Sequence, residues 1–289
     1  MSRFRLVVTP DQEAILLEHS AHARYVWNLC VEQESHWRPG RGPAPGFNER
    51  CRQLTEARAD NPWLADGSSI VQQQAIRDYH HAIQAFFAGV HGKPSWRKAK
   101  RREGFRIVML KPDHIRRLNR KAGEVWIPKV GWVRFRWSRE VPADVRSFRV
   151  TRDRAGRWHV AFAAVPQPIP GPGTGEVVGI DRGVAVSAAL STGEMCTVPG
   201  WSKGEQRRFR RLERRLSKAR RGSKRRENVR RQRARLFARE SDRRKDWAEK
   251  LSTRVAGGFD IIRVEDLHTG PVSSERPDQA IDCGAVNAD

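Results

Sequence analysis

Two carboxylates at the ends of predicted strands are the residues of this chain whose type and spacing could do chemistry. Asp181 follows the apolar pair Val177-Val178, and Glu265 ends the run Ile-Ile-Arg-Val-Glu later in the chain. One carboxylate holds the strongly hydrated Mg²⁺ weakly, whereas carboxylates on adjacent strands can hold two ions about 4 Å apart for phosphodiester cleavage. The pair therefore predicts a divalent-metal site. Taken singly, Asp181 is also compatible with a glycine turn and Glu265 with a helix cap or a strand-end charge.

The elements around these acids determine whether they can meet. We expect a hairpin of residues 177–181 and 185–190 turned at 191–193, then two helices up to Gly257-Gly258, then a parallel strand at 261–265. A strand, hairpin, helices and returning strand would place the two acids side by side, as in the ribonuclease H fold.

The predicted helices between the two acids form the most basic stretch of the chain. Residues 201–250 hold 22 Lys or Arg and 7 Asp or Glu. Like charges at i,i+4 repel by a few tenths of a kcal/mol per pair, so an external polyanion is the natural neutraliser. The whole chain carries a net charge of +23, which favours nucleic acid as the partner. A solvated helical hairpin is the alternative.

The first part of the sequence predicts a strand, helices and then a sheet. A strand at 4–8 leads into a helix with Thr9 as its cap and Pro10 at its first position, and further helices are expected at 48–59 and 68–90. From Phe105 the period becomes two, which is typical of a small β-barrel or sheet. Strands are expected at 106–110, 124–128, 132–137, 147–151 and 158–165. A Pro- and Gly-rich linker at 167–175 indicates a domain boundary.

Aromatic and basic side chains alternate in two segments of this first part. Trp96 precedes Arg97, Lys98, Arg101 and Arg102, and Trp132 and Trp137 flank Arg134 and Arg136. This pattern suits base stacking and backbone contact with single-stranded nucleic acid or a heteroduplex. Trp132 and Trp137 are equally typical of core residues.

The cysteines and the apolar segments limit which kinds of metal site, disulfide and membrane segment the chain could have. The 4 Cys are far apart without a CxxC pair, which predicts neither a zinc site nor a disulfide framework but thiols in a reducing compartment. There is no apolar run near the length of a membrane span, no signal peptide and no lipidation motif. We expect a soluble, cytoplasmic and nucleoid-associated prokaryotic protein.

Several ordered motifs resemble one known family. Those that carry the resemblance are Arg3-Phe4-Arg5-Leu6, Thr9-Pro10-Asp11-Gln12-Glu13, Arg24-Tyr25-Val26-Trp27-Asn28, residues 127–133, residues 156–160, residues 178–183, Gly222-Ser223-Lys224, residues 250–253 and residues 264–267. On these motifs the chain resembles the TnpB (OrfB) proteins of insertion sequences, RNA-guided DNA endonucleases related to type V CRISPR effectors.

The resemblance implies a fold of class α+β and α/β in two domains. Residues 1–168 would form an oligonucleotide-binding-like β-barrel with a helical recognition insert at about 11–103. Residues 169–289 would form a RuvC-like, ribonuclease H-like nuclease domain with the basic helical hairpin. Asp181 and Glu265 would match the first and second catalytic, Mg²⁺-binding carboxylates. Partners would be a guide RNA and double- and single-stranded DNA.

The chain departs from the family pattern after His268. The family continues through a helix and a four-Cys zinc ribbon to a third catalytic Asp, whereas here Cys283-Gly284 and Asn287-Ala288-Asp289 resemble only the end of that segment. Asp289 would be the third carboxylate and metal ligand, without the zinc site. We therefore expect a C-terminally shortened, transposon-encoded copy with an incomplete active site. The alternative is a nuclease-inactive RNA- and DNA-binding protein, a repressor or a remnant.

The residues expected to contact nucleic acid are all basic. They are Arg97, Lys98, Arg101, Arg102, Arg134, Arg136, Arg207, Arg208, Arg214, Arg215, Arg225 and Arg226.

Overall fold

The computed structural model describes residues 2–36, 40, 42, 44–100, 103–108, 110–165 and 168–265. Contacts divide the chain into two units. The first comprises Met1–Pro168 and Trp201–Asp242, and the second comprises Ile169–Gly200 and Arg243–Asp289. The first unit thus ends its main segment within the Pro- and Gly-rich linker. None of the helices in the described ranges is both long and apolar enough to cross a membrane.

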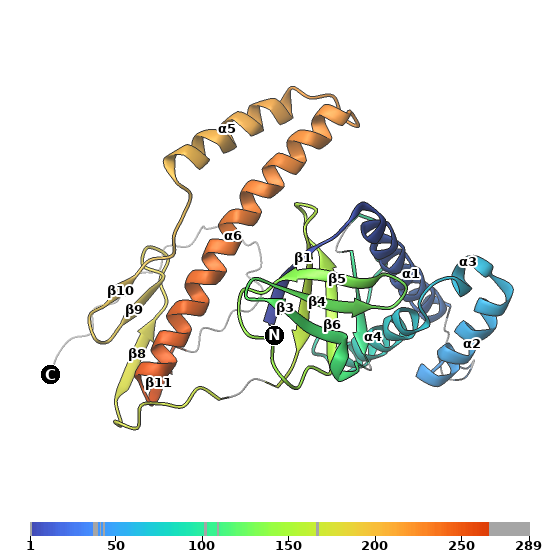
Figure 1. The fold of residues 1–289 in the computed structure, drawn as a ribbon, viewed down its shortest axis with the longest axis horizontal. Coiled ribbons are helices and arrows are strands. Elements are labelled where there is room, and N and C mark those ends of the chain that lie inside the picture. Colours follow the sequence, from blue (N-terminus) through green and yellow to red (C-terminus); the bar gives the residue numbers. More distant parts are fainter. Residues whose placement is uncertain are drawn as a thin grey trace. The chain divides into compact units, whose positions relative to one another are not determined.

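A seven-stranded antiparallel sheet forms the centre of the first unit (Figure 1). Its order is β2-β6-β7-β1-β5-β4-β3. The strands are β1 (Ser2–Val7), β2 (Gly104–Val108), β3 (Ile115–Asn119), β4 (Ala122–Ile127), β5 (Gly131–Arg136), β6 (Ser147–Arg152) and β7 (Trp158–Ala163). In this order β1 joins the two halves, with β2 and β3 at the ends. The described pairings therefore give an open strand order, and closure into a barrel stays a prediction.

Alternation along the strands divides the sheet into a buried and an exposed face. In β5, Val133 and Phe135 are buried, while Arg134 and Arg136 between and after them are exposed. Phe135 packs edge-on against Phe4 of β1, with 5.3 Å between ring centroids. The apolar side chains face the core because alternate residues of a strand point to opposite faces. The same alternation leaves the arginines to solvent.

Four helices follow β1 in the sequence before the sheet resumes. They are α1 (Pro10–Ser35), α2 (Phe47–Asp60), α3 (Pro62–Ala65) and α4 (Ser69–Phe87). The predicted start of α1 is confirmed: the Thr9 hydroxyl accepts from the Gln12 backbone N–H, the Gln12 side chain accepts from the Thr9 N–H, and Pro10 holds the first helical position. Trp27 of α1 packs edge-on against Tyr79 of α4, at 5.3 Å between centroids. Helices and sheet thereby share one core.

The second unit contains a smaller, four-stranded sheet of order β10-β9-β8-β11. Its strands are β8 (Val177–Asp181), β9 (Ala188–Leu190), β10 (Met195–Cys196) and β11 (Ile261–Val264). β9 runs antiparallel to β8 and β11 runs parallel to β8, which confirms the expected returning strand. β11 has one neighbour in the described sheet, and all four of its residues are exposed.

Two helices hold the basic stretch, α5 (Lys203–Ser217) and α6 (Lys224–Gly258). α5 begins with a capping box in which Ser202 and Glu205 bond each other's backbone N–H. Trp201, Phe209 and Phe237 form an aromatic cluster that joins the two helices, with centroids 4.8 to 5.6 Å apart. α6 ends at Gly258, where the sequence predicts its end. Its residues up to Asp242 belong to the first unit and those from Arg243 to the second.

Candidate functional site

The two predicted acids leave neighbouring strand ends in the second unit. Asp181 is the last residue of β8, and Glu265 directly follows the last residue of β11. In the parallel pairing, Val264 lies opposite Ile180, so one further residue in the same register brings Glu265 opposite Asp181. Neighbouring strands lie about 4.8 Å apart. Both acids are exposed to solvent.

The donor set of this pair matches the chemistry of Mg²⁺. Two carboxylates supply hard oxygen ligands, and Mg²⁺ in proteins takes one or two carboxylates with water in the remaining octahedral positions. Within the ranges that the structure describes, no group of three or more His, Cys, Asp or Glu could hold a metal ion. Asp289, the third predicted ligand, lies outside the described residues. The described part therefore offers a two-carboxylate donor set.

A small core supports the strand that ends in Asp181. Val178 of β8 is fully buried with Leu190 of β9 and Val255 of α6, and Trp247 and Leu251 pack against this cluster. Val178 is buried three residues before Asp181 in the same strand, so the position of the Asp181 backbone depends on this packing. Asp181 also pairs with Ala189 of β9, so its strand end has a ladder neighbour on each side.

The linker before β8 is tied to the start of β11. A carboxylate oxygen of Asp260 accepts from the backbone N–H of Gly173 at 2.9 Å, and the other oxygen accepts from that of Gly175 at 2.6 Å. These bonds lower the pKa of Asp260. At Gly171 an added Cβ would lie 2.3 Å from an Asp260 oxygen, so only glycine permits this approach. The Asp260 carboxylate thus fixes the linker at the strand ends opposite to Asp181.

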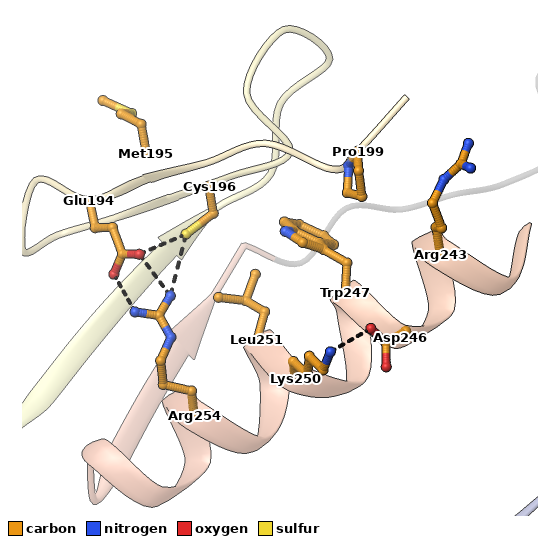
Figure 2. A pocket seen from close by; sticks show the side chains of 10 residues that line it. All are labelled: Glu194, Met195, Cys196, Pro199, Arg243, Asp246, Trp247, Lys250, Leu251 and Arg254. Carbon is orange, nitrogen blue, oxygen red and sulfur yellow. Dashed lines mark hydrogen bonds and ion pairs between the residues drawn. The ribbon is translucent and has the colours of Figure 1, made fainter. Parts of the chain in front are cut away.

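A hollow of about 570 Å³ lies between the β9–β10 hairpin and α6 in the second unit (Figure 2). Arg254 bonds both oxygens of Glu194, at 2.7 and 2.9 Å, and the Cys196 thiol donates to Glu194 at 3.3 Å. Burial, followed by the bond to Glu194, raises the pKa of Cys196, so its thiol is kept in the unreactive neutral form. Neither Asp181 nor Glu265 lines this hollow. No sequence pattern predicts this hollow, because Glu194 and Arg254 are far apart in the chain.

The predicted arginines of the basic helices divide into two groups. Five are exposed to solvent: Arg207, Arg208, Arg214, Arg215 and Arg225. Arg226 instead is half-buried and donates to the backbone carbonyls of Leu216 at 2.7 Å and Ala219 at 2.9 Å. These contacts satisfy carbonyls at the C-terminal end of α5. Arg226 therefore stabilises the turn between α5 and α6, a structural role that the sequence analysis does not predict.

The predicted basic residues before β2 also differ from one another. The Arg97 guanidinium lies over the Trp27 ring, 3.5 Å from its centroid, and burial lowers the pKa of Arg97 to about 10. The Asn28 side chain bonds both the N–H and the C=O of Arg97. Lys98 is exposed, whereas Arg101 and Arg102 lie outside the described residues. The position of Arg97 gives it a packing role on α1.

In the sheet, Arg134 and Arg136 stand on the exposed face of β5. Arg134 forms an ion pair with Glu124 at 3.4 Å. The bond from Arg116 and then that from Arg134 lower the pKa of Glu124. The Arg116 guanidinium also covers Trp132, at 3.9 Å from the ring centroid. Trp132 is therefore half-buried beneath a cation, in accord with its structural interpretation.

Sequence comparisons place the chain among transposon proteins. Residues 159–275 match the OrfB_IS605 family, described as "Probable transposase", and residues 2–42 match a family described as "Helix-turn-helix domain". A "Putative RNA-guided DNA endonuclease" from Streptomyces pristinaespiralis is 31% identical over 271 residues, which are 92% of this chain and 66% of the relative. "Putative RNA-guided DNA endonuclease InsQ" from Escherichia coli (strain K12) is 25% identical over 274 residues, which are 94% of this chain and 67% of the relative. The chain thus spans about two thirds of the length of these curated relatives.

The fold has a counterpart among solved structures. A chain in the "Cryo-EM structure of the Cas12f1-sgRNA-target DNA complex" superposes with a TM-score of 0.53 at 13% identity, over 90% of this chain and 66% of that chain. This similarity concerns the fold, a mixed α/β arrangement with one antiparallel sheet and one sheet that contains a parallel pair. Together with the matched sequence families and the curated relatives, it identifies the chain as a member of the TnpB/OrfB family of transposon proteins.

Proposed function

We propose that this protein is an RNA-guided DNA endonuclease whose second unit is a RuvC-like, ribonuclease H-like nuclease. The observation that carries the proposal is the register of β8 and β11, which brings Asp181 and Glu265 to adjacent positions at one edge of the sheet. Its curated relatives bear the name of this activity.

In this proposal Asp181 and Glu265 hold Mg²⁺ against the phosphodiester to be cut. The bound metal would supply an activated water and stabilise the leaving 3′ oxygen. The chain's own contribution is to fix two carboxylates on adjacent strand ends, because a metal site needs its ligands held in place before the substrate arrives. The Val178 core supports the strand that ends in Asp181, and the Asp260 bonds hold the linker at the opposite ends of β8 and β11.

The exposed arginines of α5 and the start of α6 would contact backbone phosphates. They are sequence-independent contacts, since phosphates carry no base identity. Guide RNA pairing with one DNA strand would supply the sequence information, while the protein recognises shape and backbone. The first unit, with its antiparallel sheet and helices, would serve as the oligonucleotide-binding-like domain with its helical insert.

Metal-dependent cleavage of a supercoiled plasmid by the protein with a matching guide RNA tests the proposal. Nicking or linearisation with Mg²⁺ by the wild-type protein, and none by Asp181→Asn or Glu265→Gln, would support the proposal. The matched control is Glu176→Gln, which removes an exposed carboxylate immediately before β8 and should cut like the wild type. RNA binding should be nearly unchanged in all three variants.

A second measurement addresses metal binding without activity. Mn²⁺ titrated into the protein and followed by its electron paramagnetic resonance signal should lose its tightest site in Asp181→Asn but not in Glu176→Gln. If the wild-type protein binds RNA but does not cut DNA, the alternative is favoured, namely that it is a nuclease-inactive RNA- and DNA-binding protein. Equal loss of RNA binding and cutting in Asp181→Asn would make that residue structural.

A further inference from the structure

A second hollow, of about 460 Å³, lies in the first unit and is lined by five arginines. They are Arg5 of β1, Arg136 of β5, Arg157 before β7, and Arg235 and Arg239 of α6. Glu13 is the one acidic residue in the described lining. We call this site the arginine hollow.

The carboxylates around the arginine hollow are already occupied by other partners. Glu13 accepts from Arg152 at 2.7 Å and from the indole N–H of Trp158 at 3.3 Å. Two further carboxylates form ion pairs with the Arg157 guanidinium: Asp153 at 2.7 Å and Asp242 at 2.6 Å between nitrogen and oxygen. Arg157 is therefore neutralised within the protein, and its ion pairs are structural.

The other four arginines of the hollow make no direct ion pair among the described residues. Within the described ranges, Arg5, Arg136, Arg235 and Arg239 form no ion pair with a carboxylate, and all four are exposed. Burial, followed by the charges of Arg136 and Arg157, lowers the pKa of Arg5, and the charges of Asp153 and Asp242 oppose this shift without reversing it. Several unpaired like charges around a concave surface raise the free energy of the free protein and favour an anion there.

We propose that the arginine hollow binds backbone phosphates of a single RNA strand, at a site separate from the exposed arginines of α5. The inference rests on the proposed function for its ligand class, and it adds Arg5, Arg235 and Arg239 to the nucleic-acid contacts. Guanidinium groups match phosphate geometry because their N–H donors form a planar fork. Since the four arginines come from three separate segments and stay open to solvent, the site suits a strand passing over it rather than one enclosed small anion.

A triple substitution that takes one arginine from each segment tests the site. In Arg5→Gln/Arg136→Gln/Arg239→Gln, the log–log slope of affinity for a short mixed-sequence single-stranded RNA against salt should fall by about two, at about 0.7 per lost phosphate contact. This difference corresponds to roughly 100-fold weaker binding at about 0.1 M salt, if the affinities converge near 1 M. The Lys versions of the same three positions should retain most of the slope, because the charge is kept.

The matched control removes the same charge from elsewhere in the first unit. Lys93→Gln/Arg120→Gln/Arg146→Gln changes three exposed cations that line neither hollow, and we expect its slope to change by less than one unit. Circular dichroism and the urea midpoint of each variant show whether it is folded. A slope equal to that of the wild type in a folded hollow variant, or an equal loss in the control, would overturn the proposal.

Inorganic triphosphate distinguishes a nucleic-acid site from a small-anion site. We expect it to bind the wild-type protein far more weakly than the RNA does. If triphosphate binds as tightly as the RNA, and only through these arginines, then the hollow takes a small polyphosphate and the RNA assignment is wrong. Binding alone is measured throughout, so the result stands whether or not the protein cuts DNA, and a failure of cleavage does not affect it.

Discussion

Arg225 and Arg226 are neighbours of identical type with different surroundings. Arg225 is exposed, whereas Arg226 bonds two carbonyls at the end of α5. Arg226→Gln should therefore lower the free energy of unfolding by about 1 kcal/mol, because charged hydrogen bonds to backbone are lost at a half-buried site. Urea unfolding measures this change.

Arg225→Gln is the counterpart of that substitution and should leave the unfolding energy within about 0.5 kcal/mol of the wild type. Its effect should fall on nucleic-acid binding, with a salt slope lower by roughly 0.7 to 0.9. Equal effects of the two substitutions on both properties would contradict the distinction between them. Sequence alone could not separate the pair, because only the helical turn decides which side chain faces α5.

His159 gives the protein a pH dependence. Burial, and then the charge of Arg3, lowers the pKa of His159 to about 4, while Asp153 and Asp242 oppose this shift. Arg3 donates to its ring nitrogen at 2.9 Å, which requires the neutral form. Because the unfolded state then binds more protons, stability should fall as pH drops from about 6.5 to about 4.

Urea unfolding at pH 7 and pH 5 checks this expectation. His159→Gln, which keeps an acceptor for Arg3 but cannot titrate, should reduce the difference in unfolding energy between the two values. Some pH dependence should remain, because burial also lowers the pKa of His19 and His22. An unchanged difference in the variant would show that His159 titrates normally in the folded protein.

At the scale of elements, the Asp260 carboxylate binds two backbone N–H groups of the Pro- and Gly-rich linker. Asp260→Ala should speed hydrogen exchange at the amides of Gly173 and Gly175, because both lose their acceptor. Asp246→Ala, which removes an exposed acid that forms an ion pair with Lys250, is the control and should leave these amides protected. The pKa of Asp260 is lowered in the folded protein, so its carboxylate should hold the linker fully at any pH above the ordinary pKa of an Asp. This stabilisation should be lost as the pH falls through the folded-state pKa of Asp260.

Unchanged protection of these two amides in Asp260→Ala would mean that the linker is held by its other contacts. These include the backbone bond from Ile261 to the Glu176 carbonyl, at 3.2 Å.

Elements with a strong periodic pattern could be predicted, and short or charged ones could not. The capped start of α1 and the parallel strand β11 are confirmed. β3 was missed because Ile-Arg-Arg-Leu-Asn has no apolar alternation, and it exists through its pairing with β4. β10 has two residues, too few to show a period. α4 ends at Phe87, three residues before the expected end, and β9 begins at Ala188 rather than Ala185.

At the scale of the whole molecule, the pairing of distant acids could be argued from sequence, while the grouping of helices could not. Asp181 and Glu265 were predicted to meet because each ends an apolar run, and the strand register agrees with that arrangement. The family resemblance implies that the basic helices belong to the domain of residues 169–289. Contacts instead group Trp201–Asp242 with the first unit, and among them is the Arg157–Asp242 ion pair at 2.6 Å. Such a contact depends on three-dimensional proximity, which no local pattern encodes.

The net charge of +23 sets the conditions under which this protein can be studied. Exposed cations keep the free protein apart from its own copies but attract any polyanion, so nucleic acid from the expression host should copurify. Affinities measured at one salt concentration would mix specific and non-specific contacts. The slope of affinity over a salt series therefore compares variants of this protein better than a single affinity does.

The exposed edge strand β11 carries a different consequence. Ile261, Ile262 and Val264 are 40 to 59% exposed, and one side of the strand has no described neighbour. Such an edge can template strand addition by another chain, which is the usual route to β-mediated aggregation. Arg263 in its middle would oppose such pairing, since stacked copies would bring like charges together. We therefore expect the residue that interrupts the apolar run to protect the strand leading to Glu265 from self-association.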